Sequence, residues 1–247
     1  TISEQLTSTE LVELLNDFLS NQTEIVIKHK GTLDKYEGDA ILAFFGAPVF
    51  FEAHAKAAID AAIEMQKNVT ELTKKWRNDE IKNWPQLVHE MKMRIGINSG
   101  EMVTGNMGSK HHMNYTMMGD VVNTAARLES SAKQYGIFFH TTEETLQNTG
   151  SKDYLWRYID RVQFVGKTVW HQTVEVLGYK NKMNKQAISM VENFNKGLEH
   201  YYNQEWDKAI ELFSKSNEHE TNNGEEDINP SKVFIKRAEE FKQFPPR

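Results

Sequence analysis

Two charged side chains lie four residues apart in a stretch that has the pattern of a β-hairpin. Lys35 and Asp39 flank a Glu-Gly turn, and the apolar run over residues 40–45 that follows is typical of a buried strand. A hairpin tip holds a carboxylate rigidly, and Gly38 would let a ligand approach the backbone closely. Because hard divalent cations prefer carboxylate oxygens, Asp39 is a candidate magnesium ligand. Taken alone, Asp39 has a simpler interpretation as a turn former.

A second set of polar residues that could contact a ligand lies in the segment 114–129. Asn123 and Arg127 are four residues apart, so a helix would place them on one face, with small residues between them. Arginine suits the spreading of negative charge, and asparagine can orient a ribose or phosphate oxygen. One such pair is also common on an ordinary polar helix face. A further cation, Lys167, follows Gly166, where a plain turn is the alternative. Metal-holding carboxylates and cationic groups are the parts that phosphoryl transfer at a nucleotide needs.

The composition excludes several function classes. The 247 residues are enough for one large domain, or for one domain with a small appendage. Lys and Arg number 29 against 35 Asp and Glu, and the net charge of −6 argues against a nucleic-acid partner. The chain has no cysteine, which excludes disulfides, thiolate metal sites and cysteine nucleophiles. No apolar run approaches the ~20 residues of a membrane helix.

We therefore expect no membrane contact from this segment, although upstream sensor or transmembrane domains are compatible with it. The expected location is cytoplasmic, with the cytosolic portion of a membrane-anchored protein as the alternative.

The order of the periodic segments predicts an α+β architecture. A capping box at residues 7–10 opens a helix, and residues 24–28 either extend it or form a short strand. The hairpin, a helix over residues 52–76 and a strand over 91–97 follow. Residues 105–112 are predicted as a polar tip between two strands. A helix from Gly119 to Tyr135, a strand over 137–140, a helix over 143–147 and two strands around Gly166 complete the pattern.

The composition becomes polar and helical from Asn181 onwards. Gly197, Trp206, Ala209 and Phe213 stand at tetratricopeptide-like offsets, and a last helix is predicted over residues 231–241. We therefore divide the chain into residues 1–180 and a small helical, tetratricopeptide-like extension over residues 181–247.

Residues 32–46 and 114–129 together resemble the catalytic domain of class III nucleotidyl cyclases, most closely the bacterial adenylate cyclases. The run Gly119-Asp-Val-Val-Asn-Thr-Ala-Ala-Arg127 matches the family's pattern Gly-Asp-x-Val-Asn-x-Ala-x-Arg. The resemblance covers residues 1 to about 178. It implies a ferredoxin-like βαββαβ core with extensions, whose first strand would precede Thr1.

The resemblance also implies roles for residues around the phosphates. Asp39 corresponds to the second of two aspartates that hold two Mg²⁺ or Mn²⁺ ions, and the first would lie upstream of Thr1. Asn123 would position the ribose, and Arg127 would stabilise the charge that develops on the phosphate. Lys167 would bind the β- and γ-phosphates, although the family more often has a second lysine where this chain has Val165.

Lys35 and Thr116 match the positions that read the base. A lysine and a hydroxyl at these places pair with the edge of adenine, whereas guanine-reading relatives usually carry Glu and Cys. A β-branched residue such as Thr116 is also an ordinary strand former.

The resemblance implies an adenylate cyclase, which converts ATP to 3′,5′-cyclic AMP and pyrophosphate. The ribose 3′-oxygen would attack the α-phosphorus at a site shared between the two protomers of a homodimer. Two alternatives remain: a guanylate cyclase, which Lys35 and Thr116 disfavour, and a silent nucleotide-binding regulatory pseudocyclase or interaction module. The regulatory alternative is disfavoured because the chain retains Asp39, Asn123, Arg127 and Lys167.

Overall fold

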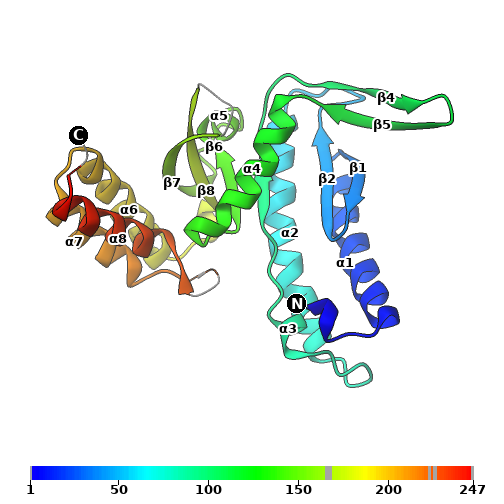
Figure 1. Ribbon diagram of the computed structural model, residues 1–247, viewed down its shortest axis with the longest axis horizontal. Coiled ribbons are helices and arrows are strands. Elements are labelled where there is room, and N and C mark those ends of the chain that lie inside the picture. The colour runs from blue at the N-terminus through cyan, green and yellow to red at the C-terminus, as the bar shows by residue number, and fades with distance from the viewer. Residues whose placement is uncertain (1, 165–168, 222–223, 225–226, 246–247) are drawn as a thin grey trace. The chain divides into compact units, whose positions relative to one another are not determined.

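The computed structural model describes residues 2–164, 169–221, 224 and 227–245. The chain divides into two compact units. The first comprises Thr1–Met93 and Gly100–Val122, and the second comprises Arg94–Ser99 and Asn123–Arg247 (Figure 1). The mixture of helices and largely antiparallel strands confirms the α+β class. No strand precedes the first long helix among residues 2–164.

The first unit is built on two long helices, α1 (Ser8–Lys28) and α2 (His54–Arg77). The predicted capping box is present, because the Thr7 and Glu10 side chains each accept a hydrogen bond from the other residue's backbone N–H. Residues 24–28 continue α1, which decides between the two alternatives for them. The short elements η1 (Ile2–Glu4) and α3 (Gln86–His89) complete the helical layer. The buried apolar side chains of its core are Leu14, Phe18, Val69, Leu72, Trp76, Trp84 and Val88.

Two hairpins complete the first unit. Strands β1 (Gly31–Glu37) and β2 (Ala40–Phe45) pair antiparallel, as do β4 (Val103–Ser109) and β5 (His112–Met118). The green β4–β5 ribbon is the long hairpin in Figure 1. The polar tip predicted over residues 105–112 was too long, since the ladder continues to the pair Ser109–His112. Backbone pairing of this kind needs no apolar side chains, so the composition could not reveal it.

The second unit contains a four-stranded sheet in the order β3-β6-β8-β7. Its strands are β3 (Ile95–Ile97), β6 (Phe139–Thr142), β7 (Tyr154–Gln163) and β8 (Trp170–Tyr179). Strand β3 is shorter than the predicted 91–97, because it pairs only with residues 139–141 of β6. The helices α4 (Asp120–Tyr135) and α5 (Glu143–Gln147) have their predicted bounds within one residue.

Strand β6 begins two residues later than predicted, because Ile137 takes part in the end of α4. Its N–H donates to the carbonyl of Ala132 at 3.1 Å, and Gly136 has a φ of +68°. This is the left-handed helix ending that glycine favours.

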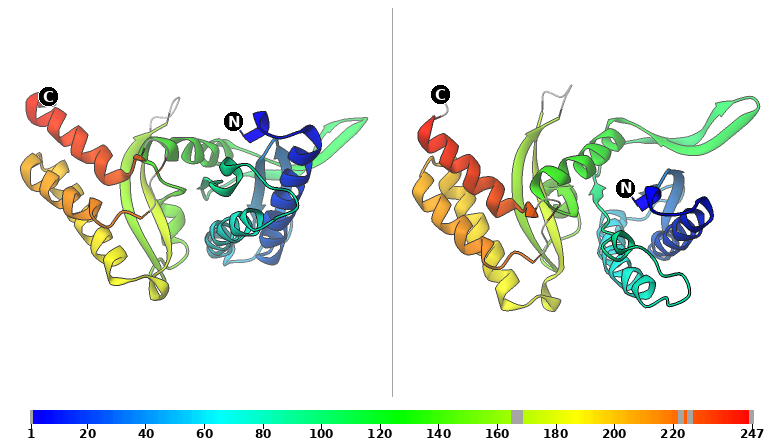
Figure 2. Two further views of the ribbon diagram at one scale, coloured as in Figure 1. Left: turned by 90° about the horizontal axis from the view of Figure 1, so that it is seen from below. Right: turned by 60° about the horizontal axis from the view of Figure 1, so that its bottom comes forward.

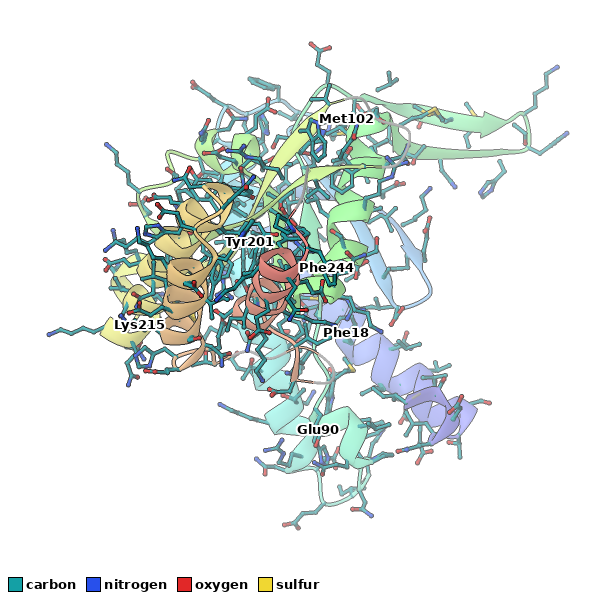
Figure 3. The ribbon with its side chains drawn as sticks, turned by 60° about the vertical axis from the view of Figure 1, so that its left-hand side comes forward. Phe18, Glu90, Met102, Tyr201, Lys215 and Phe244 are labelled. Atoms are coloured by element: carbon teal, nitrogen blue, oxygen red, sulfur yellow. The ribbon has the colours of Figure 1, made fainter. Side chains whose placement is uncertain are left out.

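In the part of the chain that the structure describes, three α-helices follow η2 (Lys180–Lys182): α6 (Lys185–Tyr202), α7 (Trp206–Asn217) and α8 (Pro230–Gln243). Figure 2 shows them, from yellow to red, gathered on one side of β7 and β8. Tyr201 packs against the Phe234 ring with centroids 5.2 Å apart, while Lys215 projects from α7 (Figure 3). The core that they share with α4 and β7 consists of Ala132, Tyr135, Ile137, Ile159, Phe194, Leu198, Ala209, Phe213 and Phe234.

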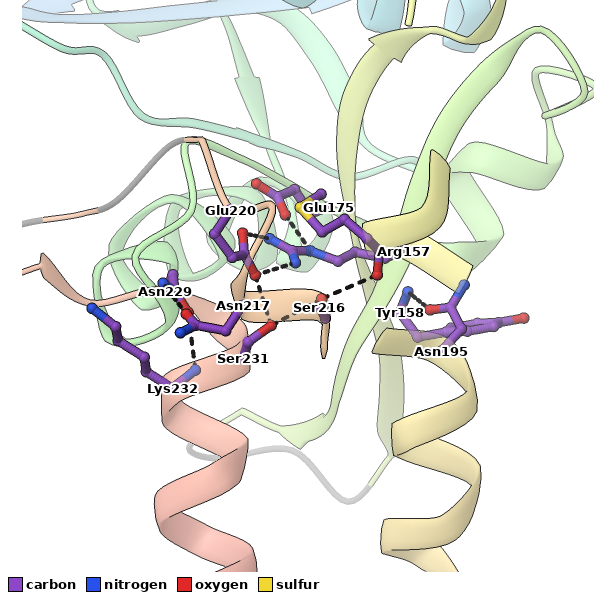
Figure 4. A network of polar contacts seen from close by, with 11 residues as sticks. Arg157, Tyr158, Glu175, Asn195, Ser216, Asn217, Glu220, Asn229, Ser231 and Lys232 are labelled. Atoms are coloured by element: carbon purple, nitrogen blue, oxygen red, sulfur yellow. Dashed lines mark hydrogen bonds and ion pairs between the residues drawn. The ribbon is translucent and has the colours of Figure 1, made fainter. Parts of the chain in front are cut away.

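A buried ionic network joins these helices to the sheet (Figure 4). Arg157 of β7 donates to Glu175 of β8 at 2.7 Å and to Glu220, which follows α7, at 2.6 and 3.1 Å. Ser231 of α8 donates to Glu220 at 2.8 Å. Burial alone would lower the pKa of Arg157, but the two facing carboxylates outweigh it and raise that pKa. The α7–α8 segment is therefore tied to the sheet by charge as well as by apolar packing.

Candidate functional site

A β-bulge in β1 brings two neighbouring charged side chains together. Leu33 pairs with Ala43 and Lys35 with Leu42, so Asp34 is an extra residue between two consecutive pairs. Neighbouring residues of a regular strand point to opposite faces, and a bulge re-aims the inserted side chain. Here the Lys35 Nζ lies 3.8 Å from the Asp34 Oδ2. The Asp34 side chain is 2% exposed and that of Lys35 is 44% exposed, so the acid is buried beneath an accessible ammonium group.

Thr116 of β5 contacts the same carboxylate oxygen. Its hydroxyl donates a hydrogen bond of 2.9 Å to the Asp34 Oδ2. The other oxygen, Oδ1, is buried and has no hydrogen-bond partner among the described residues. The structure thus brings the two predicted base-reading residues, Lys35 and Thr116, to one buried acid that the sequence did not single out. An acid next to Lys35 was visible in the sequence, but the bulge that turns it toward Thr116 was not.

Strand β4, which pairs with β5, leaves open space beside the Thr116 side chain. Gly105 of β4 is the direct partner of Thr116 in the ladder, and a Cβ atom added to Gly105 would meet nothing within 4 Å. Directly opposed residues in an antiparallel pair present their side chains on the same face. The face that carries the Thr116 side chain is therefore open next to it.

Asp39 lies within the turn of the β1–β2 hairpin. Because Glu37 pairs with Ala40, the turn consists of Gly38 and Asp39, one residue later than the predicted Glu-Gly turn. Gly38 has a φ of +65°, which a residue with a side chain rarely adopts. Asp39 is exposed, and its carboxylate has no hydrogen bond or ion pair in the part of the chain that the structure describes.

Asn123 and Arg127 lie on one face of α4, as predicted. Asn123 is exposed, whereas Arg127 is partly buried. The Nη1 of Arg127 is inaccessible to solvent and has no hydrogen-bond partner within the described ranges. Buried charged nitrogens without partners are uncommon and indicate a group that a ligand can satisfy.

Strand β3 positions this helix through a glycine. A Cβ atom added to Gly96 would lie 2.2 Å from the Ala125 carbonyl oxygen and 2.4 Å from the Glu129 nitrogen. The backbones of β3 and α4 are therefore in direct contact, which only glycine permits. Arg94 adds an ion pair from its Nε to the Glu129 carboxylate at 3.2 Å. Arg127 lies between Ala125 and Glu129 in the sequence of α4. The close packing of the Gly96 backbone against these two residues therefore fixes the position of Arg127 relative to β3.

The predicted residues thus form two sets. Lys35, Thr116 and Asp39 belong to the first unit, and Asn123 and Arg127 belong to the second. Lys167 lies outside the described residues. No group of three or more His, Asp or Glu side chains that could hold a metal ion occurs in the described ranges. None of the described helices is both long enough and apolar enough to cross a membrane.

Two comparisons bear on this arrangement. Residues 1–187 match the family described as the adenylate and guanylate cyclase catalytic domain. The chain is 34% identical over 136 residues to adenylate cyclase 1 of Rhizobium meliloti, and 32% identical over 170 residues to the adenylate cyclase of Anabaena cylindrica. These matches cover 55% and 67% of this chain but only 19% and 32% of the relatives' own lengths.

Solved structures are similar as well. The adenylyl cyclase CyaB from P. aeruginosa has a TM-score of 0.62 at 30% identity, over 74% of this chain and 89% of that one. The guanylyl cyclase Cya2 has a TM-score of 0.59 at 28% identity, over 74% of this chain and 87% of that one. With more than half of its length matched, the chain belongs to the adenylate and guanylate cyclase catalytic domain family.

Proposed function

We propose that this domain is an adenylate cyclase of class III, which converts ATP to 3′,5′-cyclic AMP and pyrophosphate. The observation that carries the choice of base is the convergence of Lys35 and Thr116 on Asp34. An ammonium group and a hydroxyl held side by side offer a donor and an acceptor to the edge of a purine. The resemblance assigns this combination to adenine.

The proposed roles on α4 follow from the chemistry of the side chains. Asn123, exposed on the helix, positions the ribose. Arg127 stabilises the charge that develops on the α-phosphate as the ribose 3′-oxygen attacks it. The partnerless Nη1 of Arg127 supports this role, because a phosphate oxygen would supply its missing acceptor. Lys167 is proposed to bind the β- and γ-phosphates.

Asp39 fits one place in a divalent metal site. Its carboxylate is exposed at a tight turn and unpaired in the described part of the chain, and Mg²⁺ is commonly bound by one or two carboxylates together with substrate phosphates. We propose that Asp39 contributes to holding two Mg²⁺ or Mn²⁺ ions, with a second aspartate in residues that precede Thr1. Such ions supply Lewis-acid stabilisation of phosphate charge when bound.

The proposed active site is shared between two copies of the chain. In the resembling family, Asp39 of one protomer would face Lys35, Thr116, Asn123, Arg127 and Lys167 arranged largely from the other. Lys35 lies in β1 and Asp39 in the turn of the same hairpin, so the two side chains can serve different sites. A symmetric homodimer would then contain two equivalent sites.

The helices α6 to α8 are proposed to be a tetratricopeptide-like extension of the cyclase domain. The packing of the first two supports this, since a Cβ atom added to Gly197 of α6 would lie 2.8 Å from the Phe213 ring of α7. A cytoplasmic location, as free protein or as part of a membrane-anchored one, belongs to the same proposal.

The test is the product formed by the purified full-length protein from ATP and from GTP, with Mg²⁺ or Mn²⁺. Cyclic AMP should be the main product, and 3′-deoxy-ATP, which lacks the attacking hydroxyl, should yield none. A higher kcat/KM for GTP would establish the guanylate cyclase alternative instead. Binding of nucleotide without turnover would establish the regulatory pseudocyclase.

A further inference from the structure

We propose that Asp34 is a positioning residue for base selection, which fixes the direction of the Thr116 hydroxyl proton so that the site accepts adenine and rejects guanine. This inference rests on the proposed function, because it takes Lys35 and Thr116 to face the base. It adds a residue that neither base-reading position reveals by itself.

The bulge provides the geometry. Asp34 is the extra residue of β1, and its side chain is almost completely buried against Thr116 of β5. Its Oδ2 accepts from Thr116 at 2.9 Å and lies 3.8 Å from the Lys35 Nζ. The same carboxylate oxygen thus accepts the Thr116 proton, while the Lys35 ammonium group lies nearby but beyond hydrogen-bond distance.

The hydrogen bond decides what Thr116 can offer to a ligand. A hydroxyl has one proton and two lone pairs, whereas a carboxylate can only accept. Because the proton of Thr116 is directed to Asp34, the remaining lone pairs of its oxygen can only accept. Lys35 can only donate. The pair thus presents one donor and one acceptor in a fixed order.

The polar edge of adenine matches this donor and acceptor, whereas the edge of guanine places like groups against them. Adenine has an acceptor at N1 for Lys35 and a donor at its N6 amine for Thr116. A guanine in the same pose would place its N1–H against the Lys35 donor, and its O6 acceptor against the Thr116 acceptor. Mismatched polar groups in a desolvated site reject a ligand strongly. Without Asp34, the Thr116 proton would be free to turn toward O6, and the penalty for guanine would fall.

Two further observations agree with this role. The space beside Gly105 is open on the face that carries the Thr116 side chain, so no neighbouring side chain of β4 covers the hydroxyl there. The second oxygen of Asp34 is buried without a partner in the described residues. An acid that served only to stabilise the hairpin would be expected to have both oxygens satisfied.

The experiment measures base preference as the ratio of dissociation constants for 3′-deoxy-GTP and 3′-deoxy-ATP, with full-length protein. Asp34→Leu keeps the branched shape of the side chain and removes its acceptors. The preference for the adenine nucleotide should fall by at least about tenfold, the size of one lost discriminating hydrogen bond. Asp34→Ala is the second variant, should Asp34→Leu fail to fold, and the same fall is expected. Glu71→Leu, an exposed acid on α2, is the matched control and should leave the ratio unchanged.

A double-mutant cycle with Thr116→Val separates positioning from a general structural role. If Asp34 acts through Thr116, Asp34→Leu will not lower the preference further once Thr116 is valine. Loss of affinity for both nucleotides in equal proportion, with the ratio retained, would overturn the inference. So would a further fall in the Thr116→Val background. The proposed function fails separately, if the wild-type protein itself prefers the guanine nucleotide or binds neither.

Discussion

The Tyr135 hydroxyl, in the last turn of α4, donates a hydrogen bond of 2.7 Å to Asp160 of β7. Arg237 of α8 donates to the same Asp160 oxygen at 2.6 Å. Burial, followed by the nearby Asp160 charge, raises the pKa of Tyr135, so the hydroxyl remains a donor. The far end of the helix that carries Asn123 and Arg127 is thus bonded to β7 and linked through Asp160 to α8.

Tyr135→Phe should lower the free energy of unfolding by about 1–2 kcal/mol, because it removes a buried hydrogen bond to a charged acceptor. Urea denaturation measures this loss. Tyr36→Phe removes an exposed hydroxyl that is 2.8 Å from Thr23, and should change stability by less than about 0.5 kcal/mol. Equal effects in the two variants would show that the Asp160 contact contributes no more to stability than the exposed Thr23 contact does.

Arg157→Met should destabilise the protein by about 3–5 kcal/mol, because it leaves Glu175 and Glu220 buried without their cation. Arg161→Met, on the same strand but exposed, should cost less than about 1 kcal/mol. Chemical denaturation compares the two, and proteolysis should cleave the α7–α8 segment faster in Arg157→Met. A small loss in both would mean that apolar packing alone holds these helices.

Arg127→Ala should lower kcat by on the order of 10²–10³ while KM changes little, since its charge is needed chiefly in the transition state. Steady-state kinetics with ATP separates the two constants. Gln134→Ala, on the exposed part of the same helix, is the control and should behave as wild type. An effect confined to KM would make Arg127 a ground-state binding residue.

A mixture of Asp39→Ala and Arg127→Ala chains should recover activity, because a heterodimer with a shared site has one site free of both changes. A mixture of Asn123→Ala and Arg127→Ala should not recover, since both changes fall in the same half of each site. Turnover is measured after heterodimers have been isolated through two affinity tags. Isolated heterodimers of the first mixture that remained inactive would contradict the shared site.

Stability should fall on acidification from about pH 6.5 toward pH 4. Burial lowers the pKa of His140 from its ordinary 6.5 to about 4, although its hydrogen bond to the Leu128 carbonyl opposes this. In this window the unfolded chain binds a proton that the folded chain does not, so acid favours unfolding, by on the order of 3 kcal/mol at most. His140→Asn should flatten this slope and exposed His111→Asn should not, as urea denaturation across the pH range will show.

The sequence allowed most elements with a local signal to be predicted. The capping box of Thr7 and Glu10, the turn at Gly38 and the helix ending at Gly136 all depend on residues close in the chain. The short β3, the late start of β6 and the long β4–β5 ladder were mispredicted, because strand pairing depends on partners that are distant in the sequence.

The same limit applies to the candidate site. Motif spacing indicated Lys35, Thr116, Asn123 and Arg127, but it did not indicate Asp34, which lies beside the first two, because a bulge in β1 has no sequence signature. The direct contact of Gly96 with α4 was missed for a similar reason, since a glycine in a strand does not reveal what lies against it.

The bulge at Asp34 also bears on how such a domain can diversify. Its flanking residues pair with Ala43 and Leu42, which are consecutive, so residue 34 lengthens β1 without shifting its register. A chain without this residue could keep every other pair, with Lys35 and the Asp39 turn in place. Insertion or loss of a single codon would thus add or remove the buried acid in one evolutionary step, leaving the rest of the hairpin unaltered.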